Sequence, residues 1–417
     1  MKLDDVLSAL KVNGGFREAV APGWEKSMEE FPVGIPSFLC ADEYKPIREY
    51  CGMKPEADDV LDKLSARIAE KKELLLLAWH CYYQMLKDDK IANFRDWPLF
   101  EDELGDLGGA FYLIVALAMV PFIRTKFQEL GVPDDVCRDT CGNMRCLSSN
   151  YENGYGGMPG VIPQQLYWIR HYIKGEIFRL GRMEYWSREL KLMGKVFRDE
   201  KTGRKILFAM DGQKFDKDGF AANPEGPDAP GIWKAEYMED AKSVTGNPLS
   251  AFGHALRDKI TLPLNEWKDV LREGSLVLDM HIPAGGNMSP EVCLDSLKRA
   301  FDFFGRYLPE RKSDVISCRS WIFSPQYEKK LPDSNIAKFM RELYLYPFYA
   351  GDRCGFFFAF LREYKNLAEA PRDTSLRRAM LELIDAGEPL RGGGMFIFRE
   401  DLKHFGTQCY RGTECLL

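Results

Sequence analysis

The chain has 417 residues, and at roughly 100–200 residues per domain this length predicts two or three domains. Apolar residues make up 45% of the sequence and aromatic residues 13%, which is enough for large packed cores and excludes wholesale disorder. The formal net charge is −6 and the pI about 5.7, whereas a protein that binds duplex nucleic acid normally carries a basic excess on one face, so we expect no nucleic-acid partner.

The cysteine content and the first residues indicate a reducing compartment. The chain has eleven cysteines, an odd number with irregular spacing, whereas secreted disulfide frameworks are usually short and cysteine-dense. Residues 1–5 read MKLDD and carry acidic side chains where a signal peptide needs an apolar run. We therefore expect a cytoplasmic protein.

Residues 1–150 show the periodicity of helices. Apolar side chains recur at helical spacing between residues 58 and 87, and residues 101–130 continue in the same style. Asp134 or Asp135 is suited to cap a further helix that reaches about residue 147. Because no long stretch alternates with the period of a strand, the pattern predicts an all-helical N-terminal domain.

One run, residues 108–123, is apolar and uncharged over 16 residues. A helix needs about 20 residues to span a bilayer. Pro121 lies near the end of the run and Arg124 follows it directly. We therefore expect a buried core helix and no membrane partner.

Three cysteines, Cys137, Cys141 and Cys146, raise the question of a metal site. Their spacing matches neither the radical-enzyme iron–sulfur pattern nor the shorter pairs of structural zinc, and a fourth ligand is missing. Cys137 and Cys141 lie one helical turn apart, so we expect them to pack in a helix core and expect no metal.

Residues 149–163 interrupt the helical pattern with six glycines and prolines, which are typical of turns and linkers. We place a domain boundary here. The predicted domains are a helical N-terminal domain, 1–150, and a second domain, 151–417.

After this segment the sequence predicts a mixture of strands and helices. Residues 211–230 resemble a long loop, and Gly392 to Gly394 a hairpin turn. The fold class is α+β, an all-helical N-terminal domain followed by a mixed α/β domain. The expected strands are 176–186, 205–210, 232–238, 276–282, 315–323, 355–361 and 395–398, and the expected helices are 164–174, 290–307, 335–345 and 375–386.

The most informative unit is the strand, glycine turn and helix between residues 276 and 307. Gly285 and Gly286 permit a tight turn, and Ser289 is a good N-cap residue. Outward backbone N–H groups and the helix dipole make such a junction suited to an anion such as a pyrophosphate. An ordinary strand-to-helix turn explains the same residues, because every helix start has such donors. We expect the strands at 276–282 and 315–323 to be parallel neighbours joined by this helix.

The same strand carries Asp279 and His281 on one face. Residues two apart on a strand face lie about 6.5–7 Å apart, too far for an obligatory hydrogen bond but close enough to line one cleft. His281 is suited to act as a general base near neutral pH. The alternative is a polar strand face with a structural histidine.

Four segments together resemble one bacterial group of acyltransferase-like proteins. They read RLGRMEY at 179–185, LDMHIPAGG at 278–286, CRSWI at 318–322 and DTSLRRA at 373–379. The group has a helical N-acyltransferase N-terminal domain followed by a GNAT-like C-terminal domain. The resemblance covers most of the chain and is strongest over residues 176–398.

The resemblance implies a central mixed sheet with acyl-CoA bound where two strands splay apart. It places the CoA pyrophosphate on the turn at 283–290, and the expected CoA-binding residues are Ile282, Ala284, Gly285, Gly286, Asn287 and Ser289. The usual turn motif is Gln/Arg-x-x-Gly-x-Gly/Ala, from which this turn departs.

The resemblance also implies an acyl transfer from acyl-CoA to a small-molecule or peptide amine, with a base for the amine and an acid for the thiolate. His281 or Glu236 is the expected base, and Tyr344 is the expected acid, with Tyr346 beside it. Packing residues are the alternative explanation for both tyrosines. The alternative function is an inactive GNAT-fold binding or regulatory module, which the unusual turn favours.

Overall fold

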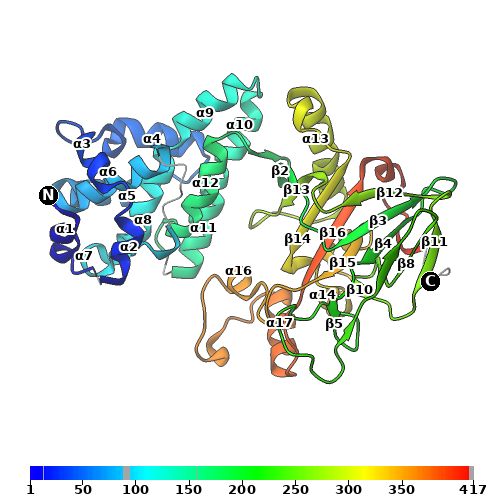
Figure 1. Ribbon diagram of the computed structural model, residues 1–417. Coiled ribbons are helices and arrows are strands. Elements are labelled where there is room, and N and C mark those ends of the chain that lie inside the picture. The colour runs from blue at the N-terminus through cyan, green and yellow to red at the C-terminus, as the bar shows by residue number, and fades with distance from the viewer. Residues whose placement is uncertain (13, 88–93, 156, 413–417) are drawn as a thin grey trace. The chain divides into compact units, whose positions relative to one another are not determined.

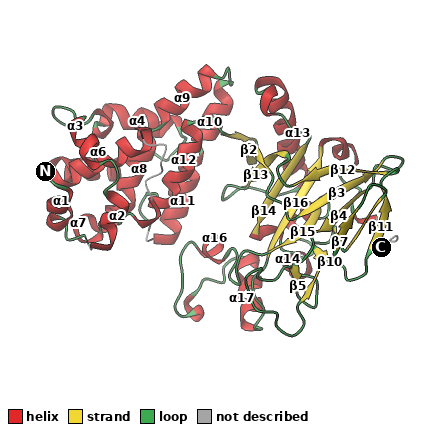
Figure 2. Cartoon of the chain, viewed as in Figure 1, coloured by secondary structure: helices red, strands yellow, loops and turns green. Residues whose placement is uncertain are grey.

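The structure is a computed structural model that describes residues 1–12, 14–87, 94–155 and 157–412. It forms two compact units, Met1–Leu180 with Pro283–Gly285, and Gly181–Ile282 with Gly286–Leu417. Figure 2 shows helices over the first part of the chain and nearly all the strands in the second. The predicted fold class is therefore confirmed.

The first unit is built almost entirely from helices (Figure 1). Among the described residues up to 150 there is no strand, as the helical periodicity predicts. The α-helices are α1 (Leu3–Ala9), α2 (Arg17–Val20), α3 (Trp24–Glu29), α4 (Ala41–Tyr50), α5 (Ala57–Glu70), α6 (Lys72–Lys87), α7 (Glu101–Leu104), α8 (Gly108–Ala118), α9 (Val120–Glu129), α10 (Asp134–Cys141), α11 (Asn143–Tyr155) and α12 (Leu166–Ile173).

The apolar run lies in the centre of this unit. Every residue of α8 is buried, while Pro121 and Phe122 in α9 are exposed. The stretch Asp102–Glu129 is long and apolar enough to cross a membrane, but 78% of its most apolar window is buried inside the protein. The run therefore packs as core, although it is two helices rather than one.

The division between the units lies further along the chain than the predicted boundary at 150/151. The helix α11 continues to Tyr155, and α12 follows within the same unit. A Cβ atom at Gly109 or at Gly160 would lie 2.1 Å or 2.5 Å from the Tyr151 ring, so these glycines make room for that ring. The glycines of the predicted linker thus include one that is required for packing.

The second unit contains several antiparallel sheets and one mixed sheet. The main sheet has the order β2-β13-β14-β16-β15 in this unit, and a second sheet has the order β10-β9-β4-β3-β12. The strands are β1 (Ile177–Leu180, which ends the first unit), β2 (Met183–Glu189), β3 (Gly194–Asp199), β4 (Lys205–Ala209), β5 (Lys214–Phe215), β6 (Trp233–Lys234), β7 (Tyr237–Glu239), β8 (Ser243–Gly246), β9 (Pro248–Ser250), β10 (His254–Ala255), β11 (Ile260–Pro263), β12 (Trp267–Arg272), β13 (Leu276–His281), β14 (Val315–Ser320), β15 (Tyr344–Phe348) and β16 (Gly392–Phe398).

The strands β13 and β14 are parallel neighbours, and α13 (Pro290–Tyr307) connects them (Figure 1). This strand–helix–strand unit confirms the prediction made from the alternating strand and the helix start. The helix packs on the sheet through Ser296, whose hydroxyl accepts a hydrogen bond from the N–H of Met183 at 3.0 Å and bonds the Tyr185 hydroxyl at 3.1 Å. The helix α13 therefore covers the sheet face that carries Tyr185.

The remaining helices are α14 (Pro325–Lys330), α15 (Asn335–Met340), α16 (Phe356–Phe360) and α17 (Ser375–Asp385). The predicted strand at 355–361 is wrong, because the segment forms α16, whose Phe356 and Phe360 pack into an apolar cluster with α17. The predicted helix at 335–345 ends at Met340, and β15 begins at Tyr344.

Several predicted strands are divided. Gly181, with φ of +74°, ends β1 before β2 begins, so the run at 176–186 is two strands. The run at 232–238 holds the short strands β6 and β7, which belong to different sheets. Gly392 to Gly394 lie inside β16 rather than in a hairpin turn. A Cβ at Gly393 would lie 2.0 Å from the Phe323 carbonyl oxygen, which explains why glycine is needed in this strand.

Candidate functional site

The central feature of the main sheet is an opening between β13 and β14. Their parallel pairs are Leu278 with Ile316 and Asp279 with Ser317. Beyond these pairs β13 continues along β2 to His281, and β14 continues along β16 to Ser320. The two strands therefore part at their carboxyl ends, which is where open α/β sheets bind ligands.

One face of the sheet brings polar side chains to this opening. Residues that pair across neighbouring strands point to the same face, and side chains alternate along each strand. The pairing register thus places a set of residues from all five strands on the face opposite α13. They are Glu184, Trp186 and Arg188 on β2, Asp279 and His281 on β13, Ser317 and Arg319 on β14, Gly394 and Phe396 on β16, and Tyr344 and Tyr346 on β15.

The predicted base His281 lies in this set. Its Nε2 is 3.4 Å from Oδ2 of Asp279, although the two residues are two positions apart on the strand. The same Oδ2 is 3.5 Å from Nη1 of Arg188, whose guanidinium lies 4.5 Å from the centre of the Trp186 ring. The side chains of Asp279 and His281 lean together, and both remain partly exposed, at 22% and 29%.

Tyr346 reaches the same region from the far side of β16. A Cβ at Gly394 would lie 2.1 Å from the Tyr346 ring, so the ring crosses the strand where glycine leaves space. The hydroxyl is buried and has no hydrogen-bond partner among the described residues. Burial raises the pKa of Tyr346 well above its usual range, while the nearby Ser317 hydroxyl and Arg319 guanidinium act in the opposite direction. Ser317 is thus close, but outside hydrogen-bonding geometry.

Tyr344, the predicted acid, lies in a different environment. Its hydroxyl donates to the Leu249 carbonyl oxygen at 2.6 Å and accepts from the Leu207 N–H at 3.1 Å. Its ring stacks on Phe396 with 4.6 Å between centroids. These contacts join the main sheet to the second sheet and favour a structural role, so Tyr346 is the better candidate for an acid.

Glu236, the second predicted base, is not brought to the opening. It lies between β6 and β7, its side chain is 70% exposed, and its Oε2 is 2.6 Å from the Lys259 ammonium. An exposed carboxylate already paired with a surface lysine and remote from the opening is a poor candidate for the base.

The turn after β13 contains the predicted CoA-binding residues Ile282, Ala284, Gly285, Gly286, Asn287 and Ser289. Gly285 and Gly286 have φ angles of +73° and +78°, so the predicted need for glycine is confirmed at both. A Cβ at Gly286 would lie 3.1 Å from Nε of Arg182, which places a cationic side chain beside the turn.

Polar side chains surround the first turn of α13. Ser289 has extended backbone at the N-cap position, and the Asn287 side-chain oxygen accepts from the Ser289 N–H and from Asn335, both at 2.9 Å. Glu291 in the first turn has its pKa lowered by its own backbone N–H and by the Ser289 hydroxyl. The helix start thus favours negative charge, as its dipole predicts.

Cys137 and Cys141 are buried in α10. A hydrogen bond with Cys141 lowers the pKa of Cys137 to about 7, against the effect of burial. Within the part of the chain that the structure describes, no three His, Cys, Asp or Glu side chains gather in an arrangement that could hold a metal ion.

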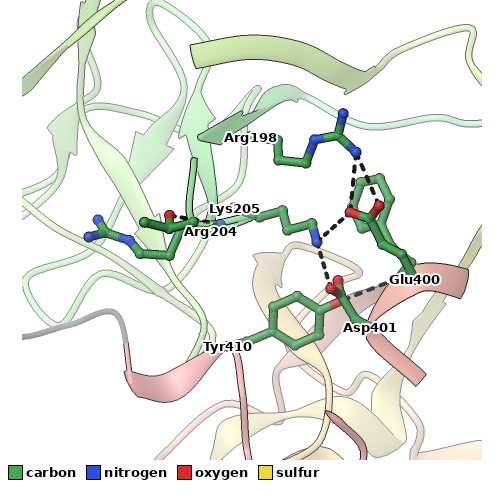
Figure 3. Close-up of polar contacts among 8 residues, drawn as sticks. Arg198, Arg204, Lys205, Glu400, Asp401 and Tyr410 are labelled. Carbon is green, nitrogen blue, oxygen red and sulfur yellow. Dashed lines mark hydrogen bonds and ion pairs between the residues drawn. The ribbon is translucent and has the colours of Figure 1, made fainter. Parts of the chain in front are cut away.

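A second polar region lies at the other end of the main sheet, where β16 ends beside the start of β14. Here a hollow of about 490 Å³ is bordered by the β3–β4 turn and by Glu400, Asp401, Lys403 and His404. Figure 3 shows the Lys205 side chain reaching toward Glu400 and Asp401. Its ammonium lies 2.8 Å from Glu400 and 2.6 Å from Asp401, and Tyr410 donates to Asp401 at 2.6 Å. We name Arg198, Lys205, Glu400, Asp401 and Tyr410 the Lys205 network.

The fold and the opening between β13 and β14 define a GNAT-like α/β domain that follows a helical domain. Residues 177–396 match the GNAT-like C-terminal domain family, and residues 42–174 match the N-acyltransferase N-terminal domain family. The chain belongs to the family with the GNAT-like C-terminal domain, as the resemblance of the four segments implies.

Solved structures of similar fold cover nearly the whole chain. One is an acyltransferase in complex with decanoyl-CoA and teicoplanin, with 21% sequence identity and a TM-score of 0.63. Another is an acyltransferase mutant in complex with octanoyl-CoA, with 20% identity and a TM-score of 0.64. Each alignment covers 95% of this chain and 99% of the other. No curated protein matches the sequence significantly.

Proposed function

We propose that this protein is an acyl-CoA-dependent N-acyltransferase. The observation that carries the proposal is the parting of β13 and β14 directly before the glycine turn and the start of α13. This arrangement offers a slot for a thioester and, one turn later, a helix N-terminus for a pyrophosphate. The two family matches and the acyl-CoA complexes of similar fold support the same reading.

In the proposed reaction the acceptor amine attacks the thioester carbonyl without a covalent enzyme intermediate. The amine nitrogen forms the new C–N bond, the C–S bond breaks, and backbone N–H groups near Met280 stabilise the oxygen. His281 takes the proton that the amine loses. Tyr346 is placed to give a proton to the leaving thiolate, which departs as CoA. The products are an amide and free CoA.

The acyl donor can be proposed more specifically than the acceptor. Relatives of similar fold bind octanoyl-CoA, decanoyl-CoA and teicoplanin, so medium-chain acyl-CoA is the first donor to test here. For the acceptor we propose an amine, either a small molecule or a peptide. The predicted cytoplasmic location belongs to the same proposal and is supported by the irregularly spaced cysteines.

Calorimetric titration with decanoyl-CoA tests this proposal. In Gly286→Val a β-branched side chain would meet Arg182 and force valine into a left-handed backbone conformation, so affinity should fall at least about tenfold. The matched control is Gly274→Val, because Gly274 also has positive φ, +80°, but has no atom within 4 Å of a Cβ. If Gly286→Val binds decanoyl-CoA as tightly as the wild type and Gly274→Val do, the CoA site lies elsewhere.

The second candidate function is an inactive GNAT-fold binding or regulatory module. The turn Ile282 to Asn287 favours it, because its sequence departs from the usual pyrophosphate motif. Release of free CoA from decanoyl-CoA in the presence of an amine panel separates the two functions. Binding of decanoyl-CoA without release for any amine supports the module.

A further inference from the structure

We propose that Asp279 is a positioning residue for His281, whose carboxylate selects the imidazole tautomer with the proton on Nε2. The other ring nitrogen, Nδ1, then carries the lone pair that takes the proton of the acceptor amine. This inference rests on the proposed acyl transfer and adds to it a residue that acts through the base rather than on the substrate.

The geometry comes from the strand itself. The alternation of β13 places Asp279 and His281 on one face, and their side chains lean together until Oδ2 and Nε2 are 3.4 Å apart. This distance is longer than that of a typical N–H···O hydrogen bond, but it is short enough for the carboxylate to attract a protonated ring nitrogen. The carboxylate is held from the other side by Arg188, 3.5 Å away.

The chemistry of the carboxylate decides the tautomer. An ionised carboxylate only accepts hydrogen bonds, so it attracts Nε2 only when that nitrogen carries a proton. A neutral His281 beside Asp279 therefore has its lone pair on Nδ1. After Nδ1 takes the amine proton, the imidazolium is stabilised by the nearby negative charge.

Arg188 sets the strength of this effect. Its guanidinium is packed on Trp186 at 4.5 Å and shares the same Oδ2 of Asp279. The positive charge of Arg188 therefore offsets part of the electrostatic effect of the Asp279 carboxylate on His281. Removing the charge of Asp279 should weaken the preference of His281 for the tautomer with the proton on Nε2, whereas removing the charge of Arg188 should preserve it.

Other charged and titratable groups face His281 from the neighbouring strands. Glu184 is its direct partner on β2, and Arg319 and Tyr346 lie on the same face across the opening. Glu184 is the only other carboxylate of this set, so it is the alternative source of a negative charge. A variant of Glu184 must therefore accompany the variant of Asp279.

Nuclear magnetic resonance of 15N-histidine-labelled full-length protein tests the proposal without a substrate. The chain has five histidines, and His281→Gln assigns the signals of His281. In the wild type the 15N shifts should show Nε2 protonated. Asp279→Asn should mix the tautomers, so that the 15N shifts of the two ring nitrogens of His281 move toward each other. Arg188→Gln leaves the Asp279 carboxylate in place and should keep the tautomer with the proton on Nε2.

The control is Asp269→Asn, which removes a strand carboxylate paired with Arg272 at 3.2 Å. It should leave the His281 signals unchanged. An unchanged tautomer in a folded Asp279→Asn protein, or a change produced by Glu184→Gln instead, would overturn the proposal. Decanoyl-CoA binding is measured on the same samples, so a failure of the proposed function is seen separately from a failure of the positioning role.

Discussion

The two ends of the main sheet differ in how closely their charged side chains are paired. At the Lys205 network the lysine side chain is 2% exposed, and its ammonium contacts the carboxylates of Glu400 and Asp401 within 2.8 Å (Figure 3). Arg198 donates a further hydrogen bond to Glu400, and Tyr410 donates one to Asp401. At the opening, Asp279 holds its partners only at 3.4–3.5 Å, and the buried Tyr346 hydroxyl has no hydrogen-bond partner among the described residues. Satisfied charges stabilise the fold, whereas loosely held ones leave capacity for a ligand.

The largest expected effect is on stability at the Lys205 network. Lys205→Met removes the cation that Asp401 and Glu400 share and should lower the free energy of unfolding by about 3 kcal/mol, because the buried Asp401 carboxylate loses its partner. Chemical denaturation measures the change. Lys201→Met is the control, since its side chain is 76% exposed, its ammonium lies 3.7 Å from Glu266, and a surface pair contributes about 0–1 kcal/mol.

Decanoyl-CoA affinity should stay unchanged in folded Lys205→Met. A loss of affinity as large as that of Gly286→Val would show that the two ends of the sheet do not have separate roles. Adding Asp401→Asn should recover part of the lost stability, because the uncompensated charge is then removed.

The next largest effects are expected for the two tyrosines of β15, one of which is hydrogen-bonded within the fold and one of which faces the opening. Tyr344→Phe leaves the Leu249 carbonyl and the Leu207 N–H without their shared hydroxyl and should cost about 1–3 kcal/mol of stability. Tyr346→Phe removes a hydroxyl that makes no hydrogen bond to any residue the structure describes and should change stability by less than about 0.5 kcal/mol. Its CoA release should fall about 100-fold if it is the acid. The reverse pattern of stability losses would refute the assignment.

The smallest expected effect is on the loss of stability at acidic pH. Burial alone would raise the pKa of Glu400, but hydrogen bonds and charge from Lys205 and Arg198 lower it overall. A carboxyl whose folded pKa lies below its unfolded value contributes stability above about pH 4.3, and that contribution is lost as the pH falls through the folded value. Unfolding measured between about pH 6 and pH 3 should therefore show a shallower acid loss in Arg198→Gln than in the wild type. Identical slopes would contradict this role of Glu400.

The strand, turn and helix that carry the candidate site were predictable from the sequence because their signals are local. The alternation of residues 276–282, the two glycines and the proline at the first helical position define β13, the turn and α13. The Asp279–His281 contact was not, since backbone spacing alone places the two residues too far apart and only the side-chain rotamers bring them together.

Residues whose roles depend on strand pairing escaped the sequence analysis. Arg188 reaches Asp279 only because β2 is antiparallel to β13, and Tyr346 reaches the opening only because Gly394 lies in the intervening strand. The short strands β8 to β12 were missed because each is only two to six residues long and none has a long alternating pattern. The glycine run at 392–394 was a local signal for this region, but the glycines make room for neighbouring groups packed against β16 rather than forming a turn.

A crystal structure of the full chain with decanoyl-CoA tests the central claim most directly. The account predicts the pyrophosphate at the turn 283–290 beside the start of α13, and the thioester between β13 and β14 with its carbonyl near Met280. Decanoyl-CoA bound instead in the hollow beside the Lys205 network, or a thioester remote from the parted strands, would contradict it.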